Sequence, residues 1–422
     1  MGARRRTRGT LSLLAAGAIL LTAGCTGGDD EAGAGTTLNW FVAIQPGGTI
    51  QEVAQRCSEE SDGRYTVEVE LLPTLADQQR EQLVRRLGAE DSTVDIIGMD
   101  VIWTAEFANA GWLRPWEGEL EQQVTESVFA PVLETASFEG QLYGAPFNSN
   151  TQLLWYRTDE VEEPPATWEE MIADAEEAGG FVQVQANRYE GYTVWANTMI
   201  QSAGTEILAG PTEVDLEQAP TEAALSVIGQ LSGSPAAAPN IDTSTEDTAR
   251  LGFEAGDSPF MLNYTFAFAS AGANAPEIAE NMDAAKLPRV VPDQESRPPL
   301  GGFNLGVSAF SENPELAFEA AACLSNAESQ LTATELDGLP PSREDLYEEK
   351  VVQDAFPDFA DDIRRSIATA APRPLTPAYT DLSLAIQRAL HSPSKIDPQD
   401  PGPVYDDLLD KIEQAVLREG LL

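Results

Sequence analysis

From residue 37 onward, short apolar segments alternate with longer amphipathic ones, and this alternation constrains the fold more than any other feature of the chain. Strands are expected at 37–44, 65–72 and 94–99, with helices at 49–61 and 77–87 between them. Strands that alternate with helices of this length are typical of an α/β sheet with helices on both faces. We therefore expect this part of the chain to form such a layer.

Beyond Tyr156 the pattern becomes mainly helical. Thr167 and Glu170 have the spacing of a capping box, which predicts a helix that ends near Ala178. The remaining expected elements are helices at 221–231, 380–391 and 405–417, a helix that begins at Asn313-Pro314, and strands at 258–263 and 300–308. Roughly 390 residues follow the N-terminal leader, enough for two or three domains.

The N-terminus has the features of an export signal. Arginines at positions 4, 5, 6 and 8 precede an apolar run at 11–21 that is too short to remain as a membrane-spanning helix. Thr22-Ala23-Gly24-Cys25 then presents small residues before a cysteine. We expect a signal peptide at 1–24, a lipid on Cys25, and a hydrated tether at 25–36. The protein would then sit on the extracytoplasmic face of the cell membrane.

Two questions about this leader stay open. The leucine that usually stands three places before a lipidated cysteine is absent, and Leu21 lies one place further away. An ordinary signal peptide that leaves Cys25 as a free thiol is therefore an alternative. The arginine cluster fits either general secretion or twin-arginine export.

The charge balance excludes one class of partner. The chain has 25 basic and 69 acidic side chains, a net charge of −44. Nucleic-acid binding depends on basic patches that neutralise phosphates, and this chain has too few basic residues for them. The acidic, lysine-poor composition favours an environment of high salt, where screening removes self-repulsion.

Cys57 and Cys323 remain after the expected anchor. An even number of cysteines in an exported chain predicts one disulfide, although two separate buried thiols are the alternative. Neither cysteine has a histidine or second cysteine at metal-ligand spacing, so we expect no metal site and no cofactor.

A series of short motifs resembles one family throughout nearly all of the mature chain. In order, they are Asp95–Trp103, Phe107–Leu113, Leu142–Phe147, Leu154–Asp159, Pro165–Glu170, Arg188–Gly191, Phe253–Gly256, Gly301–Gly306 and Pro372–Pro377. Together they resemble the extracellular solute-binding proteins of ABC importers, in the maltose- and trehalose-binding branch, with most similarity to actinobacterial trehalose-binding lipoproteins.

The resemblance implies a two-lobed periplasmic-binding-protein fold of type II, α/β in class, with a ligand cleft between the lobes. The chain would cross a hinge three times, near 147–151, 264–269 and 309–314. The N-terminal lobe would hold 37–147 plus 268–310, and the C-terminal lobe 151–264 plus 314–422. It also implies a monomer that binds a sugar such as trehalose or maltose. The protein would deliver this sugar to an ABC importer made of two permease subunits and a cytoplasmic ATPase.

Sugar sites combine aromatic faces for the ring with planar polar groups for pairs of hydroxyls. By resemblance, Asp100 and Arg373 are the main polar candidates. Asp100 has a helix cap as its alternative role, and Arg373, which has a two-pronged donor group, has a surface ion pair as its alternative. The other candidates are Asn148, Asn150, Tyr189, Tyr264, Phe266 (for which core packing is the alternative), Phe303, Gly338, Leu339, Gln79 and Glu254.

Two other functions need to be separated from sugar capture. An exported glycoside hydrolase would need two carboxylates about 5 to 10 Å apart, and with 69 acidic residues such pairs arise by chance. The motifs above carry no catalysis in the family that they resemble, and the single histidine, His391, lies in a C-terminal helix. A structural surface protein would need neither the cleft aromatics nor the hinge.

Overall fold

The structure is a computed structural model that describes residues 35–74 and 76–417. The expected signal peptide, Cys25 and the tether up to residue 34 lie outside the described residues. From residue 35 onward the chain forms one compact unit. Within the described residues, we find no helix with the length and apolar character needed to cross a membrane.

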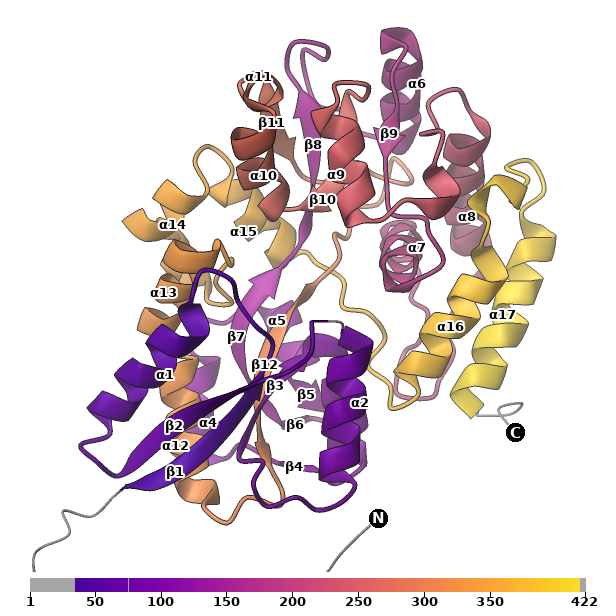
Figure 1. The fold of residues 1–422 in the computed structure, drawn as a ribbon. Coiled ribbons are helices and arrows are strands. Elements are labelled where there is room, and N and C mark those ends of the chain that lie inside the picture. Colours follow the sequence, from indigo (N-terminus) through magenta and orange to yellow (C-terminus); the bar gives the residue numbers. More distant parts are fainter. Residues whose placement is uncertain (1–34, 75, 418–422) are drawn as a thin grey trace, which may run out of the picture. The chain divides into compact units, whose positions relative to one another are not determined.

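The first lobe is built on one six-stranded sheet (Figure 1). Its strands are β1 (Thr36–Val42), β2 (Tyr65–Leu71), β3 (Ile96–Asp100), β4 (Leu113–Arg114), β7 (Gly144–Asn150) and β12 (Gly301–Ser308). The order is β2-β1-β3-β12-β4, and β7 also pairs with β12. β1 is parallel to β2 and β3, whereas β12 runs antiparallel to β3, β4 and β7.

Helices cover both faces of this sheet, as the alternating pattern predicts. The elements around it are α1 (Thr49–Glu60), α2 (Ala76–Leu87), η1 (Val101–Trp103), α3 (Thr104–Asn109), α4 (Gly118–Thr125), α5 (Ala130–Thr135), the hairpin β5 (Ser137–Phe138) and β6 (Gln141–Leu142), α12 (Pro314–Leu324) and α13 (Ala327–Asp337). Apolar side chains of α1 and α12 pack on one face, with Ile50 and Ala320 fully buried. Leu83 and Leu87 of α2 are buried with Phe107 on the other face.

The second lobe has a four-stranded sheet in the order β11-β8-β10-β9. Its elements are β8 (Gln152–Arg157), α6 (Trp168–Ala178), β9 (Val182–Gln183), α7 (Glu190–Ser202), α8 (Gln218–Gly233), η2 (Ile241–Thr243), α9 (Glu246–Glu254), β10 (Phe260–Tyr264), α10 (Phe266–Asn274), α11 (Pro276–Ala279), β11 (Met282–Ala285), η3 (Glu344–Glu348), α14 (Lys350–Ala355), α15 (Ala360–Ala368), α16 (Tyr379–Leu390), η4 (Pro393–Lys395) and α17 (Gly402–Leu417). The capping box expected at Thr167 and Glu170 opens α6.

The chain passes between the two sheets three times. The first passage is at Thr151, where β7 of the first sheet leads directly into β8 of the second. The second lies between Arg297, whose backbone N–H donates to Ser202 Oγ in the second lobe, and Gly301 at the start of β12. The third follows α13, because Ser342 still bonds to Gln330 while Val352 packs with the second sheet.

Two of the expected lobe boundaries are wrong. Residues 268–310 were assigned to the first lobe, but β11 pairs with β8 in the second sheet, and Leu287 and Val290 are buried in the core of that lobe. The passage therefore comes near residue 300 and not near 264–269. The four-residue strand β11 and the turns that follow it stay with the second lobe because their hydrogen-bond partners are there.

The segment after β12 was placed in the second lobe, yet α12 and α13 pack on the first. Ala317 and Ala333 are buried with first-lobe residues, so the third passage is not near 309–314. The expected disulfide is present between Cys57 of α1 and Cys323 of α12, with Cα atoms 5.9 Å apart. This bridge fixes α12 to the first lobe.

Candidate ligand-binding site

Three candidate residues lie side by side at the end of the first sheet. In the strand register, Phe303 of β12 is opposite Asp100 of β3 on one side and Asn148 of β7 on the other. Residues that are opposite each other on neighbouring strands share a face of the sheet. Gly302 makes this arrangement possible, because a Cβ atom there would lie 2.2 Å from the carbonyl oxygen of Asn148. The sequence therefore places an acid, an aromatic ring and an amide together.

Arg373 connects this edge of the first lobe to the second lobe. Its Nη2 lies 3.4 Å from Asp100 Oδ1, and its Nη1 lies 2.8 Å from Glu190 Oε1 at the start of α7. The guanidinium is also over the ring of Tyr379, 5.8 Å from the ring centroid. Arg373 is only 7% exposed, so its charge is compensated almost entirely by these neighbours.

Glu190 is itself held from three sides. Besides Arg373, the hydroxyl of Tyr379 donates to Oε1, and that of Ser383 donates to Oε2 at 2.6 Å. Both donors come from α16, which packs against α7. The arginine, the carboxylate and α16 therefore form one connected group. We call Asp100, Glu190, Arg373 and Tyr379 the polar cluster.

The pKa directions in this cluster reflect burial and charge. Burial raises the pKa of Asp100, and the nearby Arg373 opposes this rise. Burial alone would lower the pKa of Arg373, but Tyr379, Asp100 and Glu190 together raise it. Burial also raises the pKa of Tyr264, with Arg373 opposing. Tyr264 is thus electrostatically coupled to the polar cluster.

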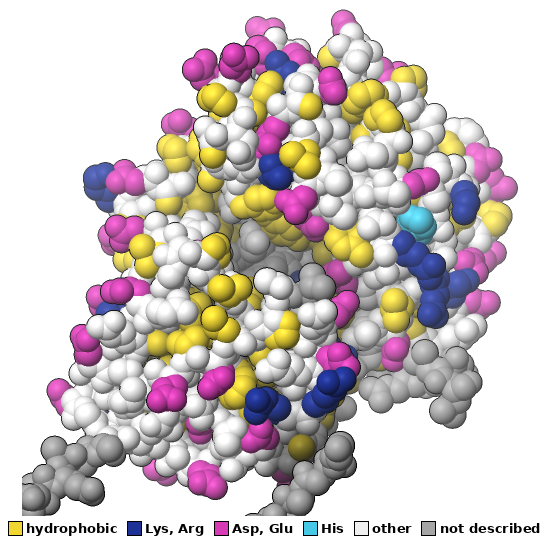
Figure 2. Space-filling model, in the orientation of Figure 1, with side chains coloured by type: hydrophobic (Ala, Val, Ile, Leu, Met, Phe, Trp, Pro, Cys, Tyr) yellow, Lys and Arg dark blue, Asp and Glu magenta, His cyan; other side chains and the backbone are white. Residues whose placement is uncertain are grey.

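A cavity of about 410 Å³ lies between the lobes next to this cluster. Tyr264 and Phe266 of the second lobe line it, together with Asn150 at the first passage between lobes and Gly338-Leu339 of the first lobe. Its volume is within the range of ligand pockets. Figure 2 shows a hollow in the middle of this face of the molecule, with hydrophobic side chains above and below it.

A loop of the first lobe forms part of the cavity wall. Asp337 accepts hydrogen bonds from the backbone N–H groups of Gly47 and Thr49, and from the Thr49 hydroxyl. A Cβ at Gly47 would lie 2.0 Å from the carbonyl oxygen of Leu336, so only glycine permits this approach. The left-handed Gly338, with φ of 63°, then ends α13 and turns the chain toward Leu339.

Comparison with known families gives a clear result. Residues 52–358 match the profile of the bacterial extracellular solute-binding proteins, which is more than half of the chain. The chain belongs to this family. A curated relative, a probable ABC transporter-binding protein of Deinococcus radiodurans, is 28% identical over 347 residues, covering 78% of this chain and 81% of the relative.

Solved structures share the fold of this solute-binding protein. Maltose-bound MalE3 of T. maritima superposes with a TM-score of 0.76 at 22% identity, over 90% of this chain and 99% of that one. The GacH receptor of Streptomyces glaucescens, solved unliganded and in complex with acarbose, also has a TM-score of 0.76, at 20% identity over 91% and 99%. At these identities the likeness shows the fold: two lobes of the type II periplasmic-binding-protein class.

The structure of the solute-binding protein brings most of the candidate residues together. Asn150, Tyr264, Phe266, Gly338 and Leu339 line the cavity, and Asp100 and Arg373 form part of the polar cluster beside it. Phe266 does not pack in the core, because it is 43% exposed at the start of α10. The helix-cap alternative for Asp100 is also present: its carboxylate accepts from the N–H of Ile102 at 3.2 Å.

Tyr189 and Phe303 are candidates that are not in the lining of the cavity but have partners or neighbours close to the site. The hydroxyl of Tyr189 donates to Glu246 Oε2 at 2.6 Å, and the backbone carbonyl of Glu246 accepts from Asn263, which precedes the cavity-lining Tyr264. Phe303 is partly buried and packs against the core of the first lobe, while its register places it beside Asp100.

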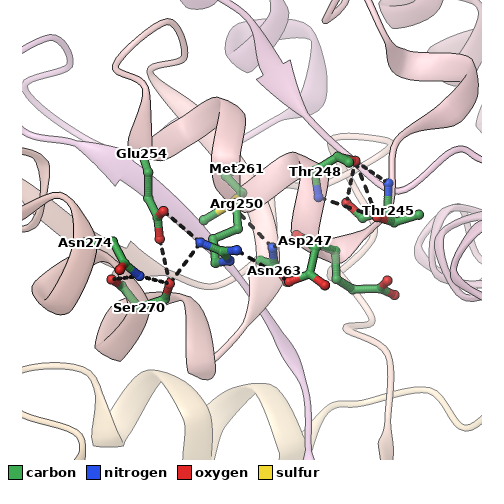
Figure 3. A network of polar contacts seen from close by, with 10 residues as sticks. Thr245, Asp247, Thr248, Arg250, Glu254, Met261, Asn263, Ser270 and Asn274 are labelled. Atoms are coloured by element: carbon green, nitrogen blue, oxygen red, sulfur yellow. Dashed lines mark hydrogen bonds and ion pairs between the residues drawn. The ribbon is translucent and has the colours of Figure 1, made fainter. Parts of the chain in front are cut away.

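Two candidates, Glu254 and Gln79, do not line the cavity. Glu254 of α9 is bound by Arg250 Nη1 at 2.7 Å and by the hydroxyl of Ser270 at 2.7 Å, and Figure 3 shows its carboxylate turned toward both. Both of its oxygens are thus used within the second lobe. Gln79 of α2 is 6% exposed, and no contact found among the described residues joins it to the cavity or the polar cluster.

The sequence did not single out several residues of the site. Glu190 follows Tyr189 within the Arg188–Gly191 motif, and this motif is the sequence signal that points to it. Phe268, Phe356 and Phe359 line the cavity from α10 and from the segment between α14 and α15. Nothing in the spacing of these phenylalanines distinguishes them from core residues. In the part of the chain that the structure describes, no group of three acidic, histidine or cysteine residues could hold a metal ion.

The first passage between the lobes contains four consecutive residues with buried polar side-chain atoms. Asn148 Oδ1, Ser149 Oγ, Asn150 Oδ1 and Thr151 Oγ1 are all buried, and none has a hydrogen-bond partner within the described residues. Buried polar groups without partners cost free energy, and they are rare away from functional sites. Four in succession, at the end of β7 where Asn150 lines the cavity, make this segment a candidate ligand contact.

Proposed function

We propose that this protein captures a sugar between its lobes, with a disaccharide such as trehalose or maltose as the best fit, and delivers it to an ABC importer. The observation that carries the proposal is the position of Arg373, which pairs with Asp100 of one lobe and Glu190 of the other and lies over the ring of Tyr379. Charged planar groups beside an aromatic face suit pairs of hydroxyls on a pyranose.

The cleft geometry also fits capture by closure. A ligand that contacts both lobes binds the closed state better and so shifts the protein toward it. The cavity takes its walls from both lobes, and the first passage between them has the unpaired polar groups described above. The neighbours that bind maltose and acarbose support a sugar, and the Deinococcus relative supports an ABC importer.

The site residues by this proposal are Asp100, Asn148, Asn150, Tyr189, Tyr264, Phe303 and Arg373, with Gly338 and Leu339 contacting the sugar through their backbone. Glu190 joins them as the partner of Arg373. The delivery partners are two permease subunits with a cytoplasmic ATPase. A lipid on Cys25 holds the monomeric protein near them, and mass spectrometry of the mature N-terminus tests that modification.

The hydrolase alternative needs one carboxyl group that gives up a proton and one that is free to attack or activate water. The paired carboxylates here are Asp100 and Glu190, and both accept hydrogen bonds from Arg373. Glu190 also accepts from Tyr379 and Ser383. A carboxylate held by three donors is poorly suited to proton transfer, which favours binding over catalysis.

One experiment separates the functions. The chain from residue 35 onward is incubated with trehalose, maltose, sucrose or glycerophosphodiesters, followed by a thermal-shift measurement and chromatography of the sugar. Sugar binding predicts a higher melting temperature and an unchanged sugar. Release of glucose would support the hydrolase, and the absence of both effects for every compound would refute sugar capture.

A further inference from the structure

The cavity between the lobes has an apolar part that the polar cluster does not explain. Five side chains form it: Phe266 and Phe268 of α10, Leu336 of α13, and Phe356 and Phe359 beside α14 and α15. We call these five residues the apolar arm. Tyr264 and Asn150 line the same cavity, and Asn150 ends β7, whose Asn148 is opposite Phe303, which is in turn opposite Asp100 of the polar cluster.

The wall of the apolar arm is well packed. The rings of Phe268 and Phe359 lie 5.0 Å apart, and those of Phe356 and Phe359 lie 5.8 Å apart. Trp155 stacks on Phe268 from behind, at 6.0 Å. Aromatic rings held at these separations stabilise one another, so the arm keeps its shape.

The entrance to the arm exposes apolar surface from both lobes. Phe266 of the second lobe is 43% exposed and Leu336 of the first lobe is 42% exposed, although both are large hydrophobic residues. Exposed apolar side chains that line one cavity favour a ligand that covers them.

The five side chains of the apolar arm carry no hydrogen-bonding groups, in contrast to Asn150, Tyr264 and Thr265 elsewhere on the cavity lining. Asp337, the charged residue on its lining, already accepts from Gly47 and Thr49. A second sugar ring in the arm would stack on the phenylalanines but would leave its hydroxyls without partners, which costs free energy. An apolar group has no such cost.

We propose that the solute is a glycoside with an apolar aglycone, aryl or alkyl, and that the apolar arm binds the aglycone while the polar cluster binds the sugar. This inference rests on the proposed sugar-binding function. It narrows the ligand from any small sugar to an amphiphilic one. Recognition would then come from hydroxyls at one end and from burial of apolar surface at the other.

The test compares ligands that share one α-glucosyl unit. Calorimetric titrations use methyl α-D-glucopyranoside, 4-nitrophenyl α-D-glucopyranoside, maltose and trehalose with the chain from residue 35 onward. We expect the nitrophenyl glucoside to bind at least about tenfold more tightly than the methyl glucoside, since burial of an aryl group adds apolar contact.

Two variants test whether the apolar arm causes the tighter binding of the nitrophenyl glucoside. Phe266→Ser and Leu336→Ser change exposed side chains and should fold normally, and each should reduce the tenfold gain to about threefold or less. Leu251→Ser is the matched control, because Leu251 is 54% exposed on α9 and does not line the cavity. A gain that survives in both arm variants would place the aryl group elsewhere and overturn the inference.

The remaining outcomes are also decisive. If maltose or trehalose binds but the two glucosides have equal affinities, the inference fails and sugar capture stands. If the nitrophenyl group gives no gain and maltose loses affinity in Phe266→Ser, the arm holds a second sugar ring. If no sugar binds, the proposed function fails, and the inference fails with it.

Discussion

Arg373 pairs with Asp100 across the boundary between the lobes, with 3.4 Å between Nη2 and Oδ1. Asp100 ends a strand of the first lobe, whereas Arg373 lies in the segment that leads to α16 of the second. The same guanidinium holds Glu190 at 2.8 Å, so one side chain joins both lobes beside the cavity. Its replacement should therefore affect both folding and ligand capture.

Arg373→Lys should lower stability although the charge is kept. A lysine ammonium is a point charge that cannot reproduce the planar fork between two carboxylates. We expect a loss of about 1 to 2 kcal/mol, because one buried carboxylate loses its partner. Urea denaturation measures this loss. Arg85→Lys is the control, since Arg85 is exposed and pairs with Glu81 one turn away on the same helix; equal effects of the two variants would contradict the role given to Arg373.

Asp100 should give stability an identifiable pH dependence. Burial raises its pKa in the folded protein above the unfolded value, so the folded state binds its proton more tightly. This contribution is fully present below the unfolded pKa and is lost as the pH rises through the folded pKa. Relative to Asp100→Asn, the wild type should lose melting temperature as the pH rises above about 4, the usual pKa of an aspartate. A constant difference over this range would show that Asp100 does not titrate as described.

The unpaired hydroxyl of Thr151 offers a test of the first passage between lobes. Thr151→Val removes a buried hydroxyl that has no hydrogen-bond partner among residues 35–74 and 76–417, so stability should stay the same or rise by about 1 kcal/mol. Thr135→Val is the matched comparison, because the buried hydroxyl of Thr135 donates to the carbonyl of Val132 at 2.7 Å. That variant should lose about 1 kcal/mol. Equal losses in chemical denaturation would mean that Thr151 has a partner.

The disulfide between Cys57 and Cys323 should stabilise the first lobe. It closes a loop with a sequence separation of 266, and removal of a native bridge typically costs about 2 to 5 kcal/mol. Wild type should melt at a lower temperature with reducing agent than without it. The double variant Cys57→Ser/Cys323→Ser should melt at one temperature in both conditions, and a wild type that melts at the same temperature with and without reducing agent would contradict the stabilising role of the bridge.

The negative charge predicts a response to salt. With a net charge of −44 the folded chain repels itself, and screening should relieve this repulsion. The melting temperature should rise between about 0.1 and 1 M KCl, where the screening length falls from about 10 to 3 Å. A flat or falling curve would count against adaptation to high salt.

Sequence reasoning succeeded where a pattern has a single physical cause. The alternation of strands and helices predicted the covered sheets, and Thr167 with Glu170 predicted the capping box of α6. The ordered motifs included Asp100 at the end of a strand and Arg373 after a proline, and the structure pairs these two side chains; their role in sugar binding stays a prediction.

The lobe boundaries were harder to predict from the sequence, because the patterns that indicate them are weak or were not used. The four residues of β11 have no distinctive pattern, and only their pairing with β8 assigns them to the second lobe. The apolar sequence of α12 predicts a buried helix but does not indicate which lobe it packs on. The expected bridge from Cys57 to Cys323 already implied the answer, since bonded cysteines have Cα atoms within about 7 Å and thus usually share a lobe. Glu190, Phe356 and Phe359 depend on tertiary contacts that no local pattern encodes.

The most direct test of the central claim, that a sugar binds beside the polar cluster, is calorimetric titration of trehalose and maltose into the wild type and into Asp100→Ala and Arg373→Ala. Asp91→Ala, which breaks the distant ion pair with Arg86, is the control. We predict that the wild type and the control bind at least one of these sugars equally well. Each site variant, shown to be folded by circular dichroism, should lose about 2 to 4 kcal/mol of binding free energy. Unchanged affinity in both site variants would contradict the proposed site.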